Sequence, residues 1–122
     1  MLDRRTVLKG AGALPLAAVL ADPVLAAAVA GSLPEVTITT AGGRQVSAAL
    51  ALPATTPAPA VLLIHEWWGL NDQIKAVAAE LANQGYVALA VDLMGGEVAT
   101  TPDGARALTQ AVKPAEATDT LV

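Results

Sequence analysis

The chain has 122 residues, a length that suits one small domain and not two. Apolar residues make up 54% of it but only Trp67, Trp68 and Tyr86 are aromatic, so alanine, valine and leucine must supply most of the packing. The net charge of −4 gives no basic field for holding phosphates, which argues against nucleic acid as a partner. The chain has no cysteine and a single histidine, so neither a disulfide nor a metal site is expected. No cofactor is expected either.

The first thirty residues have the features of an export signal. Arg4 and Arg5 precede an uncharged apolar stretch, and small residues at 28–30 offer a peptidase site before Gly31. The pattern resembles a twin-arginine signal, with Val7 where phenylalanine is common. It implies the twin-arginine export machinery as a partner and a periplasmic or secreted location. We therefore divide the chain into a signal segment, 1–30, and a domain, 31–122.

A membrane anchor is the alternative for the same segment. A spanning helix needs about 20 uninterrupted apolar residues. Asp22 and Pro23 interrupt the apolar stretch that starts at Gly10. The remaining run is shorter than a membrane span, and its length is closer to that of the apolar core of a signal peptide. A cleaved signal is favoured, and no stable membrane span is expected.

The domain begins with a predicted hairpin followed by a buried strand. Residues 35–40 and 45–51 have strand character, and Gly42-Gly43 between them is a turn signal. Residues 53–59 contain three prolines and form a connection. The continuous apolar run at 60–65 then predicts a strand covered on both faces in a parallel sheet.

A helix and a second buried strand follow. Asn71 or Asp72 can cap the helix, and Gly85 can end it in the left-handed conformation. Its apolar residues fall on one stripe, formed by Ile74, Val77, Ala78, Leu81 and Ala82. The run at 86–91 completes a strand–helix–strand unit of parallel strands with a right-handed crossover.

Two short helices are predicted in the last third. Pro102 suits the first turn of a helix reaching about Val112, and Pro114 begins another. The second helix carries apolar residues to Val122, and an apolar face needs a partner to cover it. We therefore expect the domain to be truncated.

The candidate functional residues follow the first buried strand. Ligands of open α/β sheets bind beyond the carboxyl ends of the strands, where His65, Glu66, Trp67 and Trp68 stand. Two tryptophans in one loop suggest a pocket wall; the alternative is that they cover the sheet end and Glu66 is solvated. His65 lacks a visible Asp to orient it, which favours a structural role over a catalytic base. Asp92, after the next strand, is expected to accept from loop N–H groups.

These residues resemble the dienelactone hydrolase family. The resemblance rests on His65 to Asn71, on Gln84 to Ala88, on Asp92 to Gly96 and on Gln110 to Ala117, which occur in order at family spacing. It covers nearly all of 35–122, with Val91 where the family usually has proline. It implies an α/β-hydrolase: here a hairpin and a βαβ unit from the N-terminal part of a mainly parallel sheet.

The resemblance also implies roles for two residues. Glu66 matches the carboxylate that controls ionisation of the nucleophilic cysteine, and the Trp67 backbone N–H matches an oxyanion-hole donor. The pocket role of Trp68 comes from the two indoles of the loop and not from the resemblance. The nucleophile elbow and the later Asp and His are absent from this chain. Arg106 lies near a substrate-binding arginine of the family but out of register, so that role is not transferred.

The sequence therefore predicts an ester or lactone hydrolase that lacks its nucleophile, acid and base and is inactive alone. A serine esterase or lipase relative is the third alternative, and an elbow serine downstream would identify it. Glu66 argues for cysteine instead, because a thiol-regulating carboxylate has less purpose beside a serine. The alternative from another class is a non-catalytic module that binds a small ligand with the loop of Trp67 and Trp68.

Overall fold

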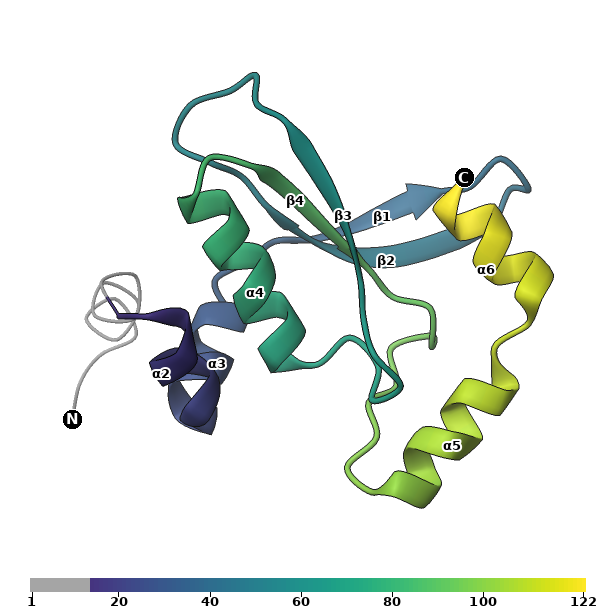
Figure 1. The fold of residues 1–122 in the computed structure, drawn as a ribbon. Helices are drawn as coiled ribbons and strands as arrows, with labels where there is room; N and C mark the ends of the chain where they lie inside the picture. The colour runs from purple at the N-terminus through teal and green to yellow at the C-terminus, as the bar shows by residue number, and fades with distance from the viewer. Residues whose placement is uncertain (1–13) are drawn as a thin grey trace.

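The structure is a computed structural model that describes residues 14–122 (Figure 1). Its elements in chain order are α2 (Leu16–Ala21), α3 (Pro23–Ala30), β1 (Glu35–Thr39), β2 (Gln45–Ala51), β3 (Ala60–Ile64), α4 (Asp72–Asn83), β4 (Val87–Val91), α5 (Pro102–Ala111) and α6 (Pro114–Leu121). In Figure 1, α4 lies with α2 and α3 at one side of the sheet, and α5 and α6 lie at the other side of the view.

The strands form one mixed sheet in the order β1-β2-β4-β3. β1 pairs with β2 as the predicted antiparallel hairpin, and β2 pairs with β4 antiparallel. β3 and β4 are parallel and joined by α4, which confirms the predicted βαβ unit. Parallel pairing is confined to β3 and β4 among the described strands.

A row of small side chains allows α4 to lie close to the sheet. Ala49 on β2 pairs with Ala90 on β4, which in turn pairs with Leu63 on β3. The same face carries Ala51 and Ala88. Leu70 and the α4 residues Ala78 and Ala82 pack on this face, and these side chains together form the α4 cluster. Alanine-on-alanine packing is how a chain with three aromatic side chains builds a core, because a short side chain lets helix and strand backbones approach.

Both ends of α4 follow the predicted capping chemistry. The Asn71 side chain accepts from the Ile74 N–H at 3.1 Å, so Asn71 and not Asp72 is the cap. Gly85 has φ +97° directly after the helix, the left-handed conformation that glycine adopts without a Cβ penalty. Of the predicted stripe, Ala78 and Ala82 are buried and Ile74 and Leu81 pack against the core; Ala76, outside the stripe, is also buried.

The prediction that β3 is covered on both faces is wrong for the described residues. β3 is the edge strand, and Leu62 and Ile64 are 44% and 50% exposed. Leu63 points to the opposite face and packs against the α4 cluster. The apolar run correctly indicated a strand that prefers burial, but composition does not say which neighbours a strand has.

Helices α2 and α3 lie within the segment predicted to be a signal. They pack against α4 and bury Val19, Ala26 and Ala30. Asp22 caps α3 by accepting from the Val24 N–H at 2.9 Å, and Pro23 follows as its first residue. Arg4 and Arg5 lie outside the described residues. Between residues 14 and 122, no helix combines the length and the apolar character needed to cross a bilayer.

α6 lies beside the turn between β1 and β2 (Figure 1), and polar contacts hold it there. Thr40 donates its hydroxyl, and Gly42 its backbone N–H, to the Asp119 carboxylate. The Arg44 guanidinium donates to the Glu116 carbonyl at 3.0 Å. None of the residues of α6 is fully buried, so these contacts rather than apolar packing define its position.

α5 begins as predicted. Pro102 is its first residue, and the Thr101 hydroxyl caps it by accepting from the Gly104 N–H at 3.1 Å. α6 likewise begins at the predicted proline, Pro114.

Candidate functional site

The parallel pairing of β3 with β4 brings two loops together at the carboxyl ends of these strands. Ile64 pairs with Val91, so the next residues along each strand, His65 and Asp92, emerge as neighbours. Both side chains are buried, although both are polar. Buried polar groups require hydrogen-bond partners, and the two loops supply them.

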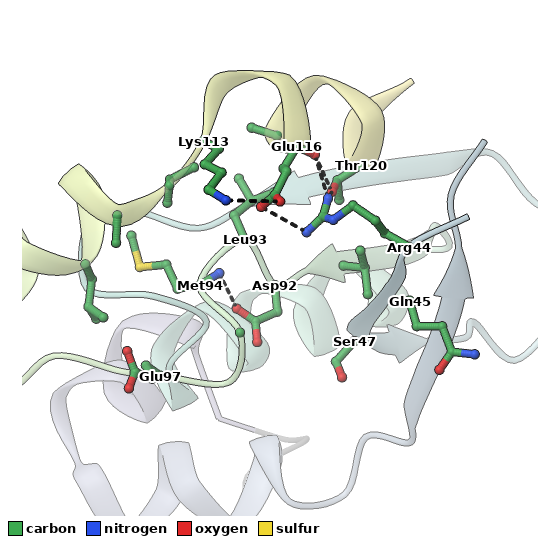
Figure 2. A pocket seen from close by; sticks show the side chains of 16 residues that line it. Arg44, Gln45, Ser47, Asp92, Leu93, Met94, Glu97, Lys113, Glu116 and Thr120 are labelled. Carbon is green, nitrogen blue, oxygen red and sulfur yellow. Dashed lines mark hydrogen bonds and ion pairs between the residues drawn. The ribbon is translucent and has the colours of Figure 1, made fainter. Parts of the chain in front are cut away.

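Asp92 organises the loop after β4. Its carboxylate accepts from the Met94 N–H at 2.8 Å (Figure 2). It also accepts from the Gly96 N–H. Gly95 and Gly96 have φ of +63° and +88°, and these left-handed conformations allow the loop to curl around the carboxylate. The predicted role of Asp92 as an acceptor for loop N–H groups is confirmed.

The two loops are fastened to each other along their length. The Ala99 N–H donates to the Trp68 carbonyl at 2.9 Å, and the Leu93 N–H donates to His65 Nε2 at 3.0 Å. Between these bonds the backbones are so close that a Cβ on Gly69 would lie 2.5 Å from the Glu97 carbonyl oxygen. Only glycine fits this contact.

The predicted site residues occupy the tip of the loop after β3. Glu66 is exposed, and within residues 14–122 its carboxylate makes no hydrogen bond or ion pair. Trp67 is 40% exposed, and Trp68 packs against it edge to face, with ring centroids 5.3 Å apart. The Trp67 backbone N–H has no acceptor among the described residues, whereas the neighbouring Gly69 N–H donates to the Glu66 carbonyl at 3.1 Å.

An open, mainly apolar cavity of about 320 Å³ lies beside Glu66 and Trp67. It is lined by His65, Glu66, Trp67, Leu93, Met94, Thr109, Val112 and Pro114. Trp68 is not among these residues; it supports Trp67 instead. The contributions of the β4 loop and of the junction between α5 and α6 carried no signal in the sequence, because they depend on contacts between distant segments.

A second cavity, of about 250 Å³, lies between β2, the β4 loop and α6 (Figure 2). Figure 2 shows Glu116 between two cations, 3.5 Å from Arg44 and 4.0 Å from Lys113. The Thr40 hydroxyl and the Gly42 N–H lower the pKa of Asp119, with a smaller contribution from Arg44. This cavity is a polar junction, and the cavity beside Trp67 is the better candidate for an apolar ligand.

The remaining candidates lie away from both cavities or form no site. Arg106 pairs with Asp103 on α5 at 3.3 Å, both side chains being largely exposed. No three His, Cys, Asp or Glu side chains come together as metal ligands in the part of the chain that the structure describes.

A mixed sheet with a βαβ unit and a polar loop at its carboxyl edge fits the N-terminal part of an α/β-hydrolase. The crystal structure of a Klebsiella pneumoniae protein named "Putative Dienelactone Hydrolase" superposes with a TM-score of 0.61 at 25% identity, over 73% of this chain and 40% of that one. The family model "Dienelactone hydrolase family" matches residues 46–121. The chain belongs to the dienelactone hydrolase family, a family of hydrolases.

Two relatives named "Putative carboxymethylenebutenolidase" also match. The protein of Saccharolobus solfataricus is 53% identical over 51 residues, 42% of this chain and 20% of its own length. The protein of Aquifex aeolicus is 48% identical over 50 residues, 38% of this chain and 22% of its own length. The matched stretch thus spans about a fifth of each relative.

Proposed function

We propose that this chain supplies the oxyanion donor and the regulating carboxylate of a carboxylic ester or lactone hydrolase. One observation carries the proposal: Glu66 and the N–H of Trp67, which has no acceptor within residues 14–122, share one peptide unit just beyond the end of parallel strand β3, beside an apolar cavity. The family membership and the names of the relatives support the reaction class.

The chemistry follows from what attack on an ester carbonyl requires. The carbonyl oxygen becomes an anion, and a fixed N–H aimed at it stabilises the transition state by about 2.7–4 kcal/mol. The Trp67 N–H is available for this bond. The Glu66 carboxylate, placed beside a thiol, would disfavour the thiolate by like-charge repulsion until substrate binding separates the two.

The nucleophile, acid and base are proposed to come from residues outside this chain. The chain has no cysteine, and its serines, Ser32 and Ser47, stand in no G-x-S-x-G context. We therefore expect the purified 122-residue chain to hydrolyse neither an aryl ester nor a lactone. Turnover by that chain, abolished by Glu66→Ala, would refute the proposal.

The coding sequence beyond Val122 provides the decisive test. A G-x-C-x-G elbow would support a cysteine hydrolase, and a G-x-S-x-G elbow a serine esterase. In a product that carries the cysteine, Glu66→Gln should shift the pH profile of thiol alkylation to lower pH, because a repelling charge is removed. Glu35→Gln is the matched control, since Glu35 is an exposed carboxylate on β1. Equal profiles for the two variants would contradict the role of Glu66.

The second candidate is a non-catalytic module that binds a small apolar ligand. The open cavity of about 320 Å³ beside the half-exposed Trp67 favours it. A stop codon directly after Val122, with quenching of tryptophan fluorescence by small apolar ligands, would support this function over hydrolysis. Quenching lost in Trp67→Phe but kept in Trp68→Phe would assign the ligand to the cavity.

Export through the twin-arginine machinery, to the periplasm or the exterior, is a separate proposal. The adjacent Arg4 and Arg5 and the small residues at 28–30 support it. Cleavage after Ala30 would remove α2 and α3 from their position against α4. Replacing both arginines with lysine should leave the precursor in the cytoplasm, and N-terminal sequencing of the exported form should begin near Gly31. Export undiminished by that replacement would contradict the route.

A further inference from the structure

His65 makes two hydrogen bonds to the backbone, one from each ring nitrogen. Nδ1 lies 2.7 Å from the Glu66 carbonyl oxygen, and Nε2 lies 3.0 Å from the Leu93 nitrogen. The side chain is buried. Its ring therefore connects the loop after β3 with the loop after β4.

The two partners together determine where the ring proton is. A backbone N–H can only donate, so Nε2 must be the unprotonated acceptor for Leu93. A carbonyl oxygen can only accept, so Nδ1 must carry the proton that goes to Glu66. Only the neutral ring protonated at Nδ1 satisfies both bonds, since an imidazolium has no lone pair for the Leu93 N–H.

The bond to the Glu66 carbonyl also orients the Trp67 N–H. These two groups belong to one planar trans peptide, so they point in opposite directions. The Glu66 carbonyl accepts from both the ring and the Gly69 N–H, which holds the peptide plane from one side. The Trp67 N–H is thereby held on the other side, and hydrogen bonds in series polarise it as a donor.

We infer that His65 is a positioning residue: in its neutral form, protonated at Nδ1, it clamps the Glu66–Trp67 peptide and ties it to Leu93, so that the Trp67 N–H is presented as a fixed donor. The catalytic meaning of that donor rests on the proposed function. Because both ring nitrogens are engaged, His65 does not act as a general base.

The ring protonation can be read directly, because His65 is the only histidine of the chain. In nitrogen-15 spectra of the full chain, we expect a directly bonded proton on Nδ1 and an unprotonated Nε2. The reverse tautomer, or an imidazolium at neutral pH, would overturn the inference. This measurement needs no substitution and therefore stands whether or not any variant folds.

Two conservative variants separate the two bonds. In His65→Asn the amide nitrogen can replace Nδ1 as donor to Glu66, whereas in His65→Gln the amide oxygen can replace Nε2 as acceptor for Leu93. His65→Phe retains the ring volume and neither bond. We expect the Trp67 amide resonance to stay near its wild-type position in the Asn variant and to shift in the Gln and Phe variants.

Amide exchange at Leu93 should respond in the complementary way. Loss of one hydrogen bond should speed exchange roughly two- to tenfold in the Asn and Phe variants, with protection kept in Gln. A Trp67 resonance that is the same in all three variants would reduce His65 to a packing residue and overturn the inference. These readouts need no turnover, so a missing nucleophile elbow would refute the proposed hydrolase and leave the clamp standing.

Discussion

The close approach of the two site loops at Gly69 leads to a quantitative prediction. Gly69 has φ +93°, and a Cβ at this position would lie 2.5 Å from the Glu97 carbonyl oxygen. Gly69→Ala therefore adds two penalties: about 1–2 kcal/mol for a left-handed conformation in a residue with a Cβ, and about 1–3 kcal/mol for forcing the backbones apart. We expect a total loss of about 2–5 kcal/mol in the free energy of unfolding.

Gly85 provides the matched control. Its φ is +97°, nearly the same as that of Gly69, but no atom of residues 14–122 lies within 4 Å of the position where its Cβ would be. Gly85→Ala should therefore lose only the conformational part, about 1–2 kcal/mol. The difference between the variants isolates the contact between the loops, because the backbone penalty cancels.

Urea unfolding followed by circular dichroism measures both variants. Gly69→Ala should also change the tryptophan emission of the native state, because parting the loops breaks the bond from Ala99 to the Trp68 carbonyl. Equal destabilisation by the two substitutions, with unchanged emission, would refute the idea that the loops are in close backbone contact at this point.

Three further predictions concern the polar contacts and the tryptophan pair. Asp92→Ala leaves two loop N–H groups without their acceptor and should reduce the free energy of unfolding by about 2–4 kcal/mol in urea titrations; a loss below about 0.5 kcal/mol would mean that water replaces the carboxylate. Because the pKa of Asp119 is lowered, the stability that its carboxylate contributes is fully present above the unfolded-state pKa of about 3.9 and is lost as pH falls through the lower folded-state pKa. Amide exchange should therefore show α6 loosening only in strong acid in the wild type, and already at pH 7 in Asp119→Leu. Acrylamide should quench the emission of Trp68→Phe more strongly than that of Trp67→Phe, because Trp67 is the more exposed tryptophan; the reverse order would contradict the orientation of the pair.

Local sequence signals predicted the centre of the fold well. The apolar runs of β3 and β4, the Asn71 cap and Gly85 act within a few residues of themselves, so a reader of the sequence can assess them one at a time. The same holds for the hairpin and for the prolines that begin α5 and α6. These predictions were confirmed because tertiary contacts did not oppose them.

The surroundings of the site were not predictable in this way. The bonds of α6 to the hairpin join residues more than seventy positions apart, Thr40 with Asp119 and Arg44 with Glu116. No periodic pattern encodes such a pairing, and the cavity beside Trp67 depends on where α5 and α6 lie. The exposure of β3 is a related case, because an apolar run indicates that a strand prefers burial but does not identify its neighbours.

The candidate site shows why residue type alone leaves the role of a histidine open. The sequence offered His65 as either a structural residue or a base, and the absence of a nearby Asp favoured the first. The parallel register supplies the missing information, because pairing of Ile64 with Val91 brings the Leu93 N–H to the ring. Apolar strands thus determine where the two loops start, and the hydrogen bonds of the loops determine the orientation of the Glu66–Trp67 peptide. An error of one residue in that register would leave the His65 ring without its donor and the Trp67 N–H without a fixed direction.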